Sequence, residues 1–318
     1  MKIIVTGALG HIGSQLIRYF PEIYHNVQIT LLDNLATQRY SSLFNLPSTG
    51  NYKFIENDVL KVNLPQLIED TDLVIHLAAL TDATSSFDSP ERIYQHNFTT
   101  TKFVAETCAK YHKPLFFPSS TSVYGPKITT IVDDTEPNKE LQPQSPYAAC
   151  KLKEEELLLK LHNEQQLSVA ICRFGTIFGP SPGMRFHTAV NKFCWQAVLR
   201  QPVTVWETAY HQRRPYLSLQ DAINIICFII ENNLFNGDIY NAVTSNHTVQ
   251  EVIANIQTIV PAIEIQFIKS DIMNKFSFTV INKKLTVQGF EFVGKLQEGI
   301  NQTIKLIKNI NTLDPLFH

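Results

Sequence analysis

The chain has 318 residues, of which 44% are hydrophobic and 18% charged, so it is neither a disordered nor a collagen-like protein. Its 27 Lys and Arg against 29 Asp and Glu leave a net charge of −2, which provides no attraction to nucleic acid or to an anionic membrane surface. Five widely spaced cysteines predict free thiols in a reducing cytoplasm, and the absence of a CxxC pair predicts no metal site. The longest strongly apolar stretch, residues 223–230, is too short to span a membrane, and an apolar run from residue 2 leaves no room for a signal peptide.

Short apolar runs alternate with helix-like segments through the first half of the chain. The runs lie at residues 2–6, 27–32, 52–55, 73–77, 115–117 and 169–173. Because strands buried on both faces and joined by long crossovers form βαβ units, this pattern predicts an α/β fold with a parallel sheet. Apolar residues at helical spacing predict a helix over 11–20, which Pro21 ends, and a long helix over 147–162 with Pro146 in its first turn.

The pattern becomes less regular after Gly179. The elements expected there are helices at 186–199, 221–230, 248–260 and 296–307 and strands at 202–206 and 237–241. We therefore expect a doubly wound, Rossmann-type parallel sheet with a smaller C-terminal α/β domain for substrate binding. The larger domain is expected at residues 1–174 and 215–243, and the smaller one at residues 175–214 and 244–318.

Three glycines follow the first predicted strand and open the first predicted helix. Gly7, Gly10 and Gly13 form G-x-x-G-x-x-G, a turn in which backbone can approach a pyrophosphate at a helix N-terminus. Asp33 lies twenty residues beyond Gly13, where a carboxylate binds the ribose hydroxyls and favours NAD over NADP. The alternative for Asp33 is a capping role in an ordinary turn, and Asp58, placed near the expected adenine, is alternatively a surface turn residue.

Two polar groups of residues are candidates for proton transfer. Tyr147 and Lys151 are four residues apart and share one helix face, where the ammonium and a cationic nicotinamide would lower the pKa of Tyr147. A hydroxyl cluster at residues 119–122 follows the fifth strand, at the edge where parallel sheets bind ligands. Each group taken alone has an ordinary explanation: a half-buried Tyr beside a solvated Lys, and turn-forming Ser and Thr.

In chain order, the motifs GALGHIG, LLDNL, HLAAL, SSTSVYG, SPYAACK, RFGTIFGP and RRPYLSLQDA resemble the extended short-chain dehydrogenase/reductase family. The set is similar in particular to NAD-dependent nucleotide-sugar epimerases and dehydratases of the UDP-glucose 4-epimerase type. The resemblance implies a catalytic set of Ser120, Tyr147 and Lys151. It implies cofactor contacts at Gly7, Gly10, His11, Ile12, Gly13, Asp33, Asn34, Asp58, Val59, Leu77, Ala78, Ala79, Asn97, Tyr147, Lys151 and Phe174. The expected substrate contacts are Ser120, Thr121, Thr176, His187, Val203, Trp206 and Arg214.

Within this substrate set the resemblance gives Arg214 the grip on the diphosphate, with a salt bridge to Asp221 as the alternative. Trp206 is expected to stack on the nucleotide base, unless it is a core residue. His187 is a ligand, a proton carrier or neither. Thr176 stands where the family usually has asparagine, which leaves the identity of the sugar open.

The residues beside Ser120 select among the reactions of the family. Family dehydratases carry Asp-Glu where this chain has Thr121 and Ser122, so the extra acid for eliminating water is missing. The resemblance therefore implies an NAD-dependent epimerase that oxidises and re-reduces a sugar carbinol, C4 of an NDP-hexose, through a 4-keto intermediate. The alternatives are an NAD(P)-dependent NDP-sugar dehydrogenase or reductase, an epimerase acting at C2 or at C3 and C5, and a non-catalytic NAD-binding module. The resemblance also implies a cytoplasmic homodimer formed by helices near 94–112 and 147–163.

Overall fold

A computed structural model of the chain describes residues 1–81, 87–125, 131–135, 141–269 and 277–309. Within these ranges the largest sheet is parallel and has seven strands in the order β11-β7-β5-β4-β1-β2-β3. Its strands are β1 (Lys2–Thr6), β2 (Gln28–Asp33), β3 (Asn51–Glu56), β4 (Leu73–His76), β5 (Leu115–Ser120), β7 (Val169–Phe174) and β11 (Asn236–Ala242). The strand order reverses between β1 and β4, and parallel sheets bind ligands beyond the carboxyl ends of such neighbouring strands.

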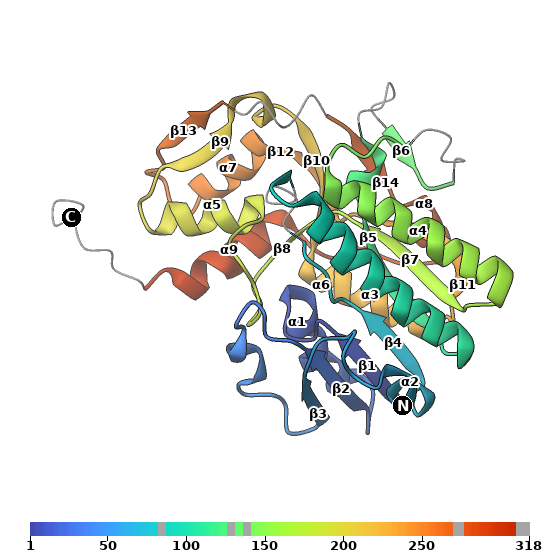
Figure 1. Ribbon diagram of the computed structural model, residues 1–318. Helices are drawn as coiled ribbons and strands as arrows, with labels where there is room; N and C mark the ends of the chain where they lie inside the picture. The colour runs from blue at the N-terminus through green and yellow to red at the C-terminus, as the bar shows by residue number, and fades with distance from the viewer. Residues whose placement is uncertain (82–86, 126–130, 136–140, 270–276, 310–318) are drawn as a thin grey trace.

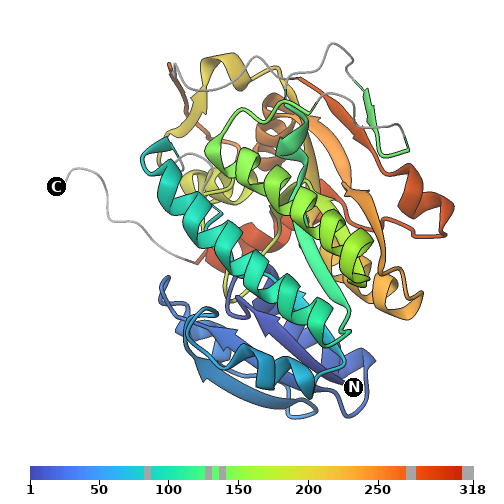
Figure 2. The same cartoon turned by 45° about the vertical axis from the view of Figure 1, so that its right-hand side comes forward.

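Helices cover both faces of this sheet. On one face lie α1 (His11–Ile23) and α6 (Leu219–Glu231), and on the other lie α2 (Leu64–Glu69), α3 (Pro90–Lys110) and α4 (Pro146–Gln165). Alternate residues of each strand enter the two cores: Ile3 faces α1 and α6, whereas Ile4 faces α2, α3 and α4. Figures 1 and 2 show α3 and α4 side by side over the sheet. The predicted doubly wound α/β class is confirmed.

The prediction that Pro21 ends the first helix is wrong, because α1 continues through it to Ile23. A proline has no N–H to donate to the carbonyl four residues earlier, which here belongs to Ile17. The hydroxyl of Tyr52 on β3 donates to that carbonyl over 3.0 Å. The proline is therefore tolerated because a neighbouring strand supplies the missing hydrogen bond.

A second apolar core lies beyond the carboxyl edge of the sheet. It is formed by α5 (Ala189–Val198), β9 (Val203–Trp206), α7 (Val249–Gln257) and α9 (Leu296–Ile307), and β13 (Ile265–Ile268) pairs with β9. A three-stranded sheet of β8 (Thr176–Phe178), β10 (Arg213–Ser218) and β12 (Ser245–Thr248) joins the two bodies. The predicted helix at 186–199 is too long, since α5 begins only after Thr188. The one at 248–260 is also too long, because a capping box formed by Thr248 and Glu251 starts α7 and the helix ends at Gln257.

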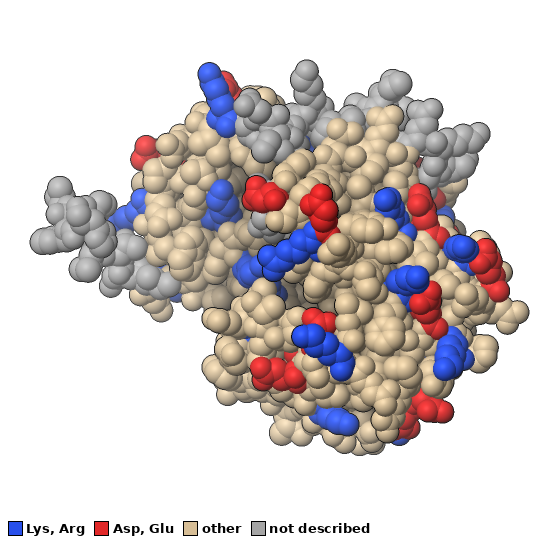
Figure 3. Space-filling view, in the orientation of Figure 1, with Lys and Arg blue, Asp and Glu red and all other residues tan. Residues whose placement is uncertain are grey.

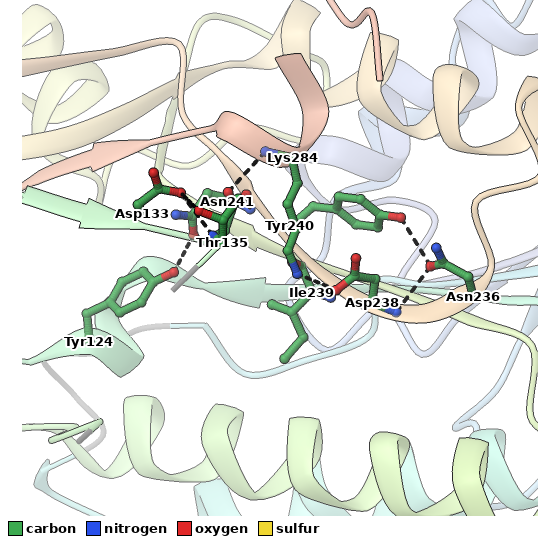
Figure 4. A network of polar contacts seen from close by, with 10 residues as sticks. Tyr124, Asp133, Thr135, Asn236, Asp238, Ile239, Tyr240, Asn241 and Lys284 are labelled. Carbon is green, nitrogen blue, oxygen red and sulfur yellow. Dashed lines mark hydrogen bonds and ion pairs between the residues drawn. The ribbon is translucent and has the colours of Figure 1, made fainter. Parts of the chain in front are cut away.

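The chain returns to the large sheet before α9. Beyond β14 (Thr279–Ile281), which pairs with β6 (Ile131–Asp133), α8 (Lys283–Val287) packs on β11. Figure 4 shows Lys284 reaching across to Asp238 and Ile239, and the Tyr124 hydroxyl donating to Asn241. Leu285 belongs to the core beneath α1 and α6. The domain division of the sequence analysis stays a proposal, with residues 282–292 assigned by these contacts to the larger body.

Three further properties bear on function. No helix of the described ranges is long and apolar enough to cross a bilayer. All five cysteines are buried and unpaired. Among the described residues no group of three or more His, Cys, Asp or Glu side chains is arranged to hold a metal ion.

Candidate active site

A cavity of about 1200 Å³ lies between the carboxyl edge of the large sheet and the second body. Figure 3 shows it as a hollow between two lobes, with Lys and Arg side chains at its margin. Sites for drug-sized ligands occupy roughly 300–1,000 Å³. The cavity is therefore large enough for a dinucleotide together with a second ligand.

The glycine turn forms one end of this cavity and fits a dinucleotide. A side chain at Gly7, which has φ +66°, would lie 2.7 Å from the backbone nitrogen of Ala78, so only glycine permits this approach of two strands. Helix α1 starts at Gly10 without a side-chain cap and without an acidic residue in its first turn. Its first N–H groups are therefore available to a pyrophosphate. Asp33 closes the turn by accepting hydrogen bonds from the amides of Leu9 (3.0 Å) and Leu35 (2.9 Å).

The expected adenine end lies beside β3. Asn34 donates to the carboxylate of Asp58 over 3.2 Å, and the same carboxylate accepts the amide of Leu60 over 2.9 Å. These bonds fix Asp58 at the rim, where it lines the cavity together with Asn34 and Val59. The carboxylates of Asp33 and Asp58 are the hydrogen-bond acceptors that ribose and adenine would meet.

Tyr147 and Lys151 project from the first turns of α4 into the cavity. Ser145 caps this helix by accepting the amide of Ala148 over 3.1 Å, and Pro146 stands at its first position as predicted. Ser120 ends β5 just before the short helix η3 (Thr121–Tyr124). Its hydroxyl oxygen accepts both the hydroxyl (2.8 Å) and the amide (3.2 Å) of Ser122, which leaves the hydroxyl hydrogen of Ser120 for an oxygen in the cavity.

Lys151 acts to lower the pKa of Tyr147 as expected, and the effect of the nicotinamide stays a prediction. Burial raises the pKa of Tyr147, and the opposing effect of Lys151 is smaller. Glu154 and Cys150 raise it further. Burial tends to lower the pKa of Lys151, but Glu154 and Tyr147 outweigh it, so the net shift is upward and the ammonium stays charged. The positive charge of an oxidised nicotinamide would act on Tyr147 in the same direction as Lys151.

A buried ion pair supports the strand that carries Ser120. Arg173 on β7 donates to Glu155 on α4 over 2.6 Å, and both side chains are almost fully buried. Ser119 donates to the same carboxylate over 2.5 Å, and the guanidinium lies 4.8 Å from the ring centroid of Tyr124. These contacts fix β5 and η3 against α4, and so fix Ser120 relative to Tyr147.

The second body supplies the opposite wall. Thr176, His187 and Trp206 line it, and the half-buried Arg214 donates to Gln212 over 2.7 Å. Thr121 lines the cavity from η3 of the larger body. Asp221, the alternative partner of Arg214, instead accepts the hydroxyl of Thr244 and the amides of Val293 and Gly294, and its own amide donates to the hydroxyl oxygen of Ser218.

The loop over residues 179–183 lies directly on the glycine turn. His11 donates through Nε2 to the carbonyl of Gly179 over 2.8 Å, and the Gly183 amide donates to Ser14 over 2.9 Å. Burial lowers the pKa of His11 to about 4, so this imidazole is neutral. A Cβ on Gly183 would lie 2.2 Å from the carbonyl oxygen of Leu9, so the two backbones meet as closely as only glycine allows.

The model of the NAD dependent epimerase/dehydratase family matches residues 3–242. The chain belongs to this family. It is 30% identical over 250 residues to a Bacillus subtilis protein described as an uncharacterized UDP-glucose epimerase, YtcB, with 76% of each chain covered. It is 29% identical to dTDP-D-glucose 4,6-dehydratase of Dictyostelium discoideum, over 80% of this chain and 62% of that protein. The structure of UDP-glucuronic acid 4-epimerase from Bacillus cereus, in complex with UDP-glucuronic acid and NAD, superposes with a TM-score of 0.84 at 25% identity and covers 97% of this chain and 99% of that one.

Family membership confirms the predicted class of enzyme and NAD as its cofactor. The roles of individual residues stay a prediction, and most of the predicted residues line the cavity. The predicted residues that line the cavity are Gly7, Gly10, His11, Ile12, Gly13, Asp33, Asn34, Asp58, Val59, Leu77, Ala78, Ala79, Ser120, Thr121, Tyr147, Lys151, Phe174, Thr176, His187, Trp206 and Arg214.

Two predicted contacts of this family member lie behind the cavity wall. The amide of Asn97 is buried and bonded in both directions to the backbone of Leu80, at 2.8 and 3.0 Å, so it shapes the loop after β4. Val203 points into the second core, and Thr204 and Val205 line the cavity in its place. Neither side chain is placed to touch a ligand directly.

The sequence analysis missed four Arg and Lys residues of the cavity: Arg39, Arg92, Arg185 and Lys192. The Nε atoms of Arg39 and Arg185 are buried and have no hydrogen-bond partner among the described residues. Burial lowers the pKa of Arg39 to about 10, and Arg185 contributes to the shift. No spacing rule points to these arginines, because loops of the two bodies bring residues 39 and 185 together only in the folded chain.

Proposed function

We propose that this protein is an NAD-dependent epimerase of nucleotide sugars that oxidises and re-reduces C4 of an NDP-hexose through a 4-keto intermediate. The observation that carries the proposal is the meeting of Ser120, Tyr147 and Lys151 with the glycine turn in one cavity. A proton-transfer set beside a dinucleotide site is what oxidation of an alcohol requires. A protein that only sensed NAD would have no use for it.

The chain's own residues act as follows. Tyr147 removes the proton of the C4 hydroxyl, and Ser120 donates a hydrogen bond to the same sugar oxygen. Lys151 holds the nicotinamide ribose and, through its charge, favours the phenolate of Tyr147. NAD, which the glycine turn and Lys151 would hold, would supply the acceptor and donor of the hydride. Arg214 grips the diphosphate, about which the keto sugar turns before it is reduced on its other face, where Tyr147 gives the proton back.

The hydroxyls beside Ser120 support an epimerase over a dehydratase. Thr121 is buried and donates to the carbonyl of Phe174 over 3.3 Å, and Ser122 donates to Ser120. Neither supplies the acid that elimination of water needs. The relatives described as acting on UDP sugars support uracil as the base of the nucleotide.

Three related statements belong to the same proposal. Residues 1–174 and 215–243 bind NAD, and most of the remainder binds the sugar nucleotide. The protein is a cytoplasmic homodimer that pairs through α3 and α4. A shallow surface pocket between these helices is lined by Tyr94, Pro146, Ala149 and Lys153, among others, and offers apolar area for such pairing.

The proposal is tested by incubating the purified protein with UDP-, GDP-, CDP- and dTDP-hexoses and identifying the products by NMR. We expect one sugar to interconvert at C4 without deuterium uptake from solvent, since direct return of hydride takes nothing from water. Tyr147→Phe is expected to lose about 10²- to 10⁴-fold in rate, the usual contribution of a general base. Unchanged turnover in that variant defeats the assignment, and release of NADH with a keto product points to the dehydrogenase alternative.

A further inference from the structure

Glu154 is a buried carboxylate at the back of the catalytic helix. It lies one residue before the structural Glu155, and none of its surface is exposed. Its Oε2 is 3.2 Å from the ammonium of Lys151, which is also buried. Its Oε1 accepts the hydroxyl of Thr101 on α3 over 2.5 Å. The carboxylate therefore sits on the side of Lys151 that faces away from the cavity.

A chain of hydrogen bonds reaches this carboxylate from the cofactor side of the sheet. Since the Thr101 hydroxyl donates to Glu154, its oxygen accepts Nε2–H of His76 over 3.2 Å. Nδ1 of His76 then accepts the hydroxyl of Thr6 over 2.7 Å, and Thr6 accepts the amide of Ala78 over 3.3 Å. Every donor in this series points toward Glu154, and the order fixes the tautomer of His76.

The series leaves a single positive charge beside the carboxylate. Burial, with Lys151 and His96 nearby, lowers the pKa of His76 to about 3, so the imidazole is neutral. Thr6 and Thr101 carry no charge. The cation that balances Glu154 is therefore the same ammonium that is expected to favour the phenolate of Tyr147.

We propose that Glu154 is a positioning residue for the reaction: it holds Lys151 in place and sets the charge of the Tyr147–Lys151 pair. The inference rests on the proposed function of that pair. Glu154 lies outside the motifs identified in the sequence. The proposal also explains the buried hydrogen-bond series from Ala78 to Glu154. The series stabilises the anion that Lys151 faces.

The consequence is a defined change in titration. Tyr147 and Lys151 interact closely, so they titrate as a pair with two macroscopic pKa values. A negative charge beside the pair disfavours loss of either proton, so removing it lowers both values. Among the described residues, the other titratable groups that act on the pair are Cys150 on α4 and His76 on β4, and His96 on α3 acts on His76. These groups are the same in every protein compared below.

The test is Glu154→Gln, which keeps the shape and the acceptor for Thr101 but removes the charge. Two quantities are measured in holoenzyme: the pH profile of kcat/KM, and the ultraviolet titration of the phenol as the difference between proteins with Tyr147 and with Tyr147→Phe. We expect both limbs of the profile and the phenol titration to move to lower pH by about one unit or more, as for a charge within roughly 4–6 Å. Glu156→Gln, an exposed glutamate on the same helix, is the matched control and should move neither.

If the Glu154→Gln protein folds but neither its pH profile of kcat/KM nor its phenol titration moves, the proposal is overturned and Glu154 has only a structural role. If that variant does not fold, Glu154→Met removes the same charge at similar volume and takes its place. The phenol titration needs no turnover. A protein that epimerises no sugar but shows the shift therefore contradicts the proposed function without contradicting the role of Glu154.

Discussion

At the scale of single residues, the site depends on polar side chains that the fold keeps from ionising. His76 is the clearest case: it is 2% exposed, is bonded through both ring nitrogens and lies near Lys151, the proposed catalytic lysine. A proton on Nδ1 would turn that atom into a donor facing the Thr6 hydroxyl and would place a second cation near Lys151. Its neutrality is therefore a condition for the order of donors that ends at Glu154.

This neutrality makes stability depend on pH. The unfolded chain binds the proton of His76 near the ordinary pKa of 6.5, and the folded protein binds it only near 3. The contribution of His76 to the free energy of unfolding is therefore complete above pH 6.5 and declines as the pH falls below that value. His11, with its pKa lowered to about 4, acts in the same direction.

His76→Gln should therefore reduce this dependence. Urea unfolding at about pH 7.5 and about pH 5.5 measures it in both proteins. An equally steep loss of stability in the variant would show that His76 does not bind the extra proton on unfolding. His25→Gln, which replaces an exposed histidine, serves as the control.

At the scale of elements, the glycine turn and the loop over residues 179–183 form one unit. Gly183→Ala should push the two backbones apart, because its Cβ would lie 2.2 Å from the Leu9 carbonyl and 2.5 Å from that of Gly10, neither of which can rotate away. We expect a lower melting temperature and weaker retention of NAD(H), read as nucleotide fluorescence after dialysis.

Pro182→Ala is the matched control for that substitution, because residue 182 is exposed in the same loop. We expect its melting temperature and NAD(H) retention to stay near those of the natural chain. If Gly183→Ala had the same melting temperature and NAD(H) retention as this control, the close approach of the two backbones would not contribute to cofactor binding.

The elements also show what local sequence can and cannot specify. The strands of the large sheet and the helix over 296–307 follow from apolar periodicity, since each buries a regular face. The true end of α1 does not, because it depends on Tyr52, a residue of another element. Likewise the motifs located Ser120, Tyr147 and Lys151, whereas Arg185 reaches the cavity only through packing of distant segments. Helix spacing alone puts Glu154 beside Lys151, but its bond to Thr101 depends on the packing of α3 against α4.

At the scale of the whole molecule, the proposed homodimer places α3 and α4 of each subunit at the contact. Tyr94 is 38% exposed on α3, stacks on Phe98 at 5.0 Å between centroids and lies beneath the ammonium of Lys153 at 4.7 Å. Tyr94→Glu would replace an apolar ring by a charged carboxylate in that contact and should convert dimer to monomer.

Light scattering coupled to gel filtration measures the mass directly. We expect the natural chain at twice the mass of one chain and Tyr94→Glu at the mass of one. Tyr40→Glu alters a tyrosine that is 52% exposed in another element, η1 (Tyr40–Leu43), and should leave the dimer intact. A natural chain that runs as a monomer, or a Tyr94→Glu dimer, contradicts this arrangement.

The loop that lies on the glycine turn has a kinetic consequence. Since His11 and Ser14 bind this loop to the first helix, we expect a dinucleotide bound at the glycine turn to leave only after residues 179–183 separate locally from that helix. Exchange with the surrounding pool then becomes slow compared with catalysis. An epimerase returns the hydride to the sugar from which it was taken, so it needs no external oxidant or reductant. Slow release of the cofactor would therefore allow one nicotinamide to take part in many catalytic cycles.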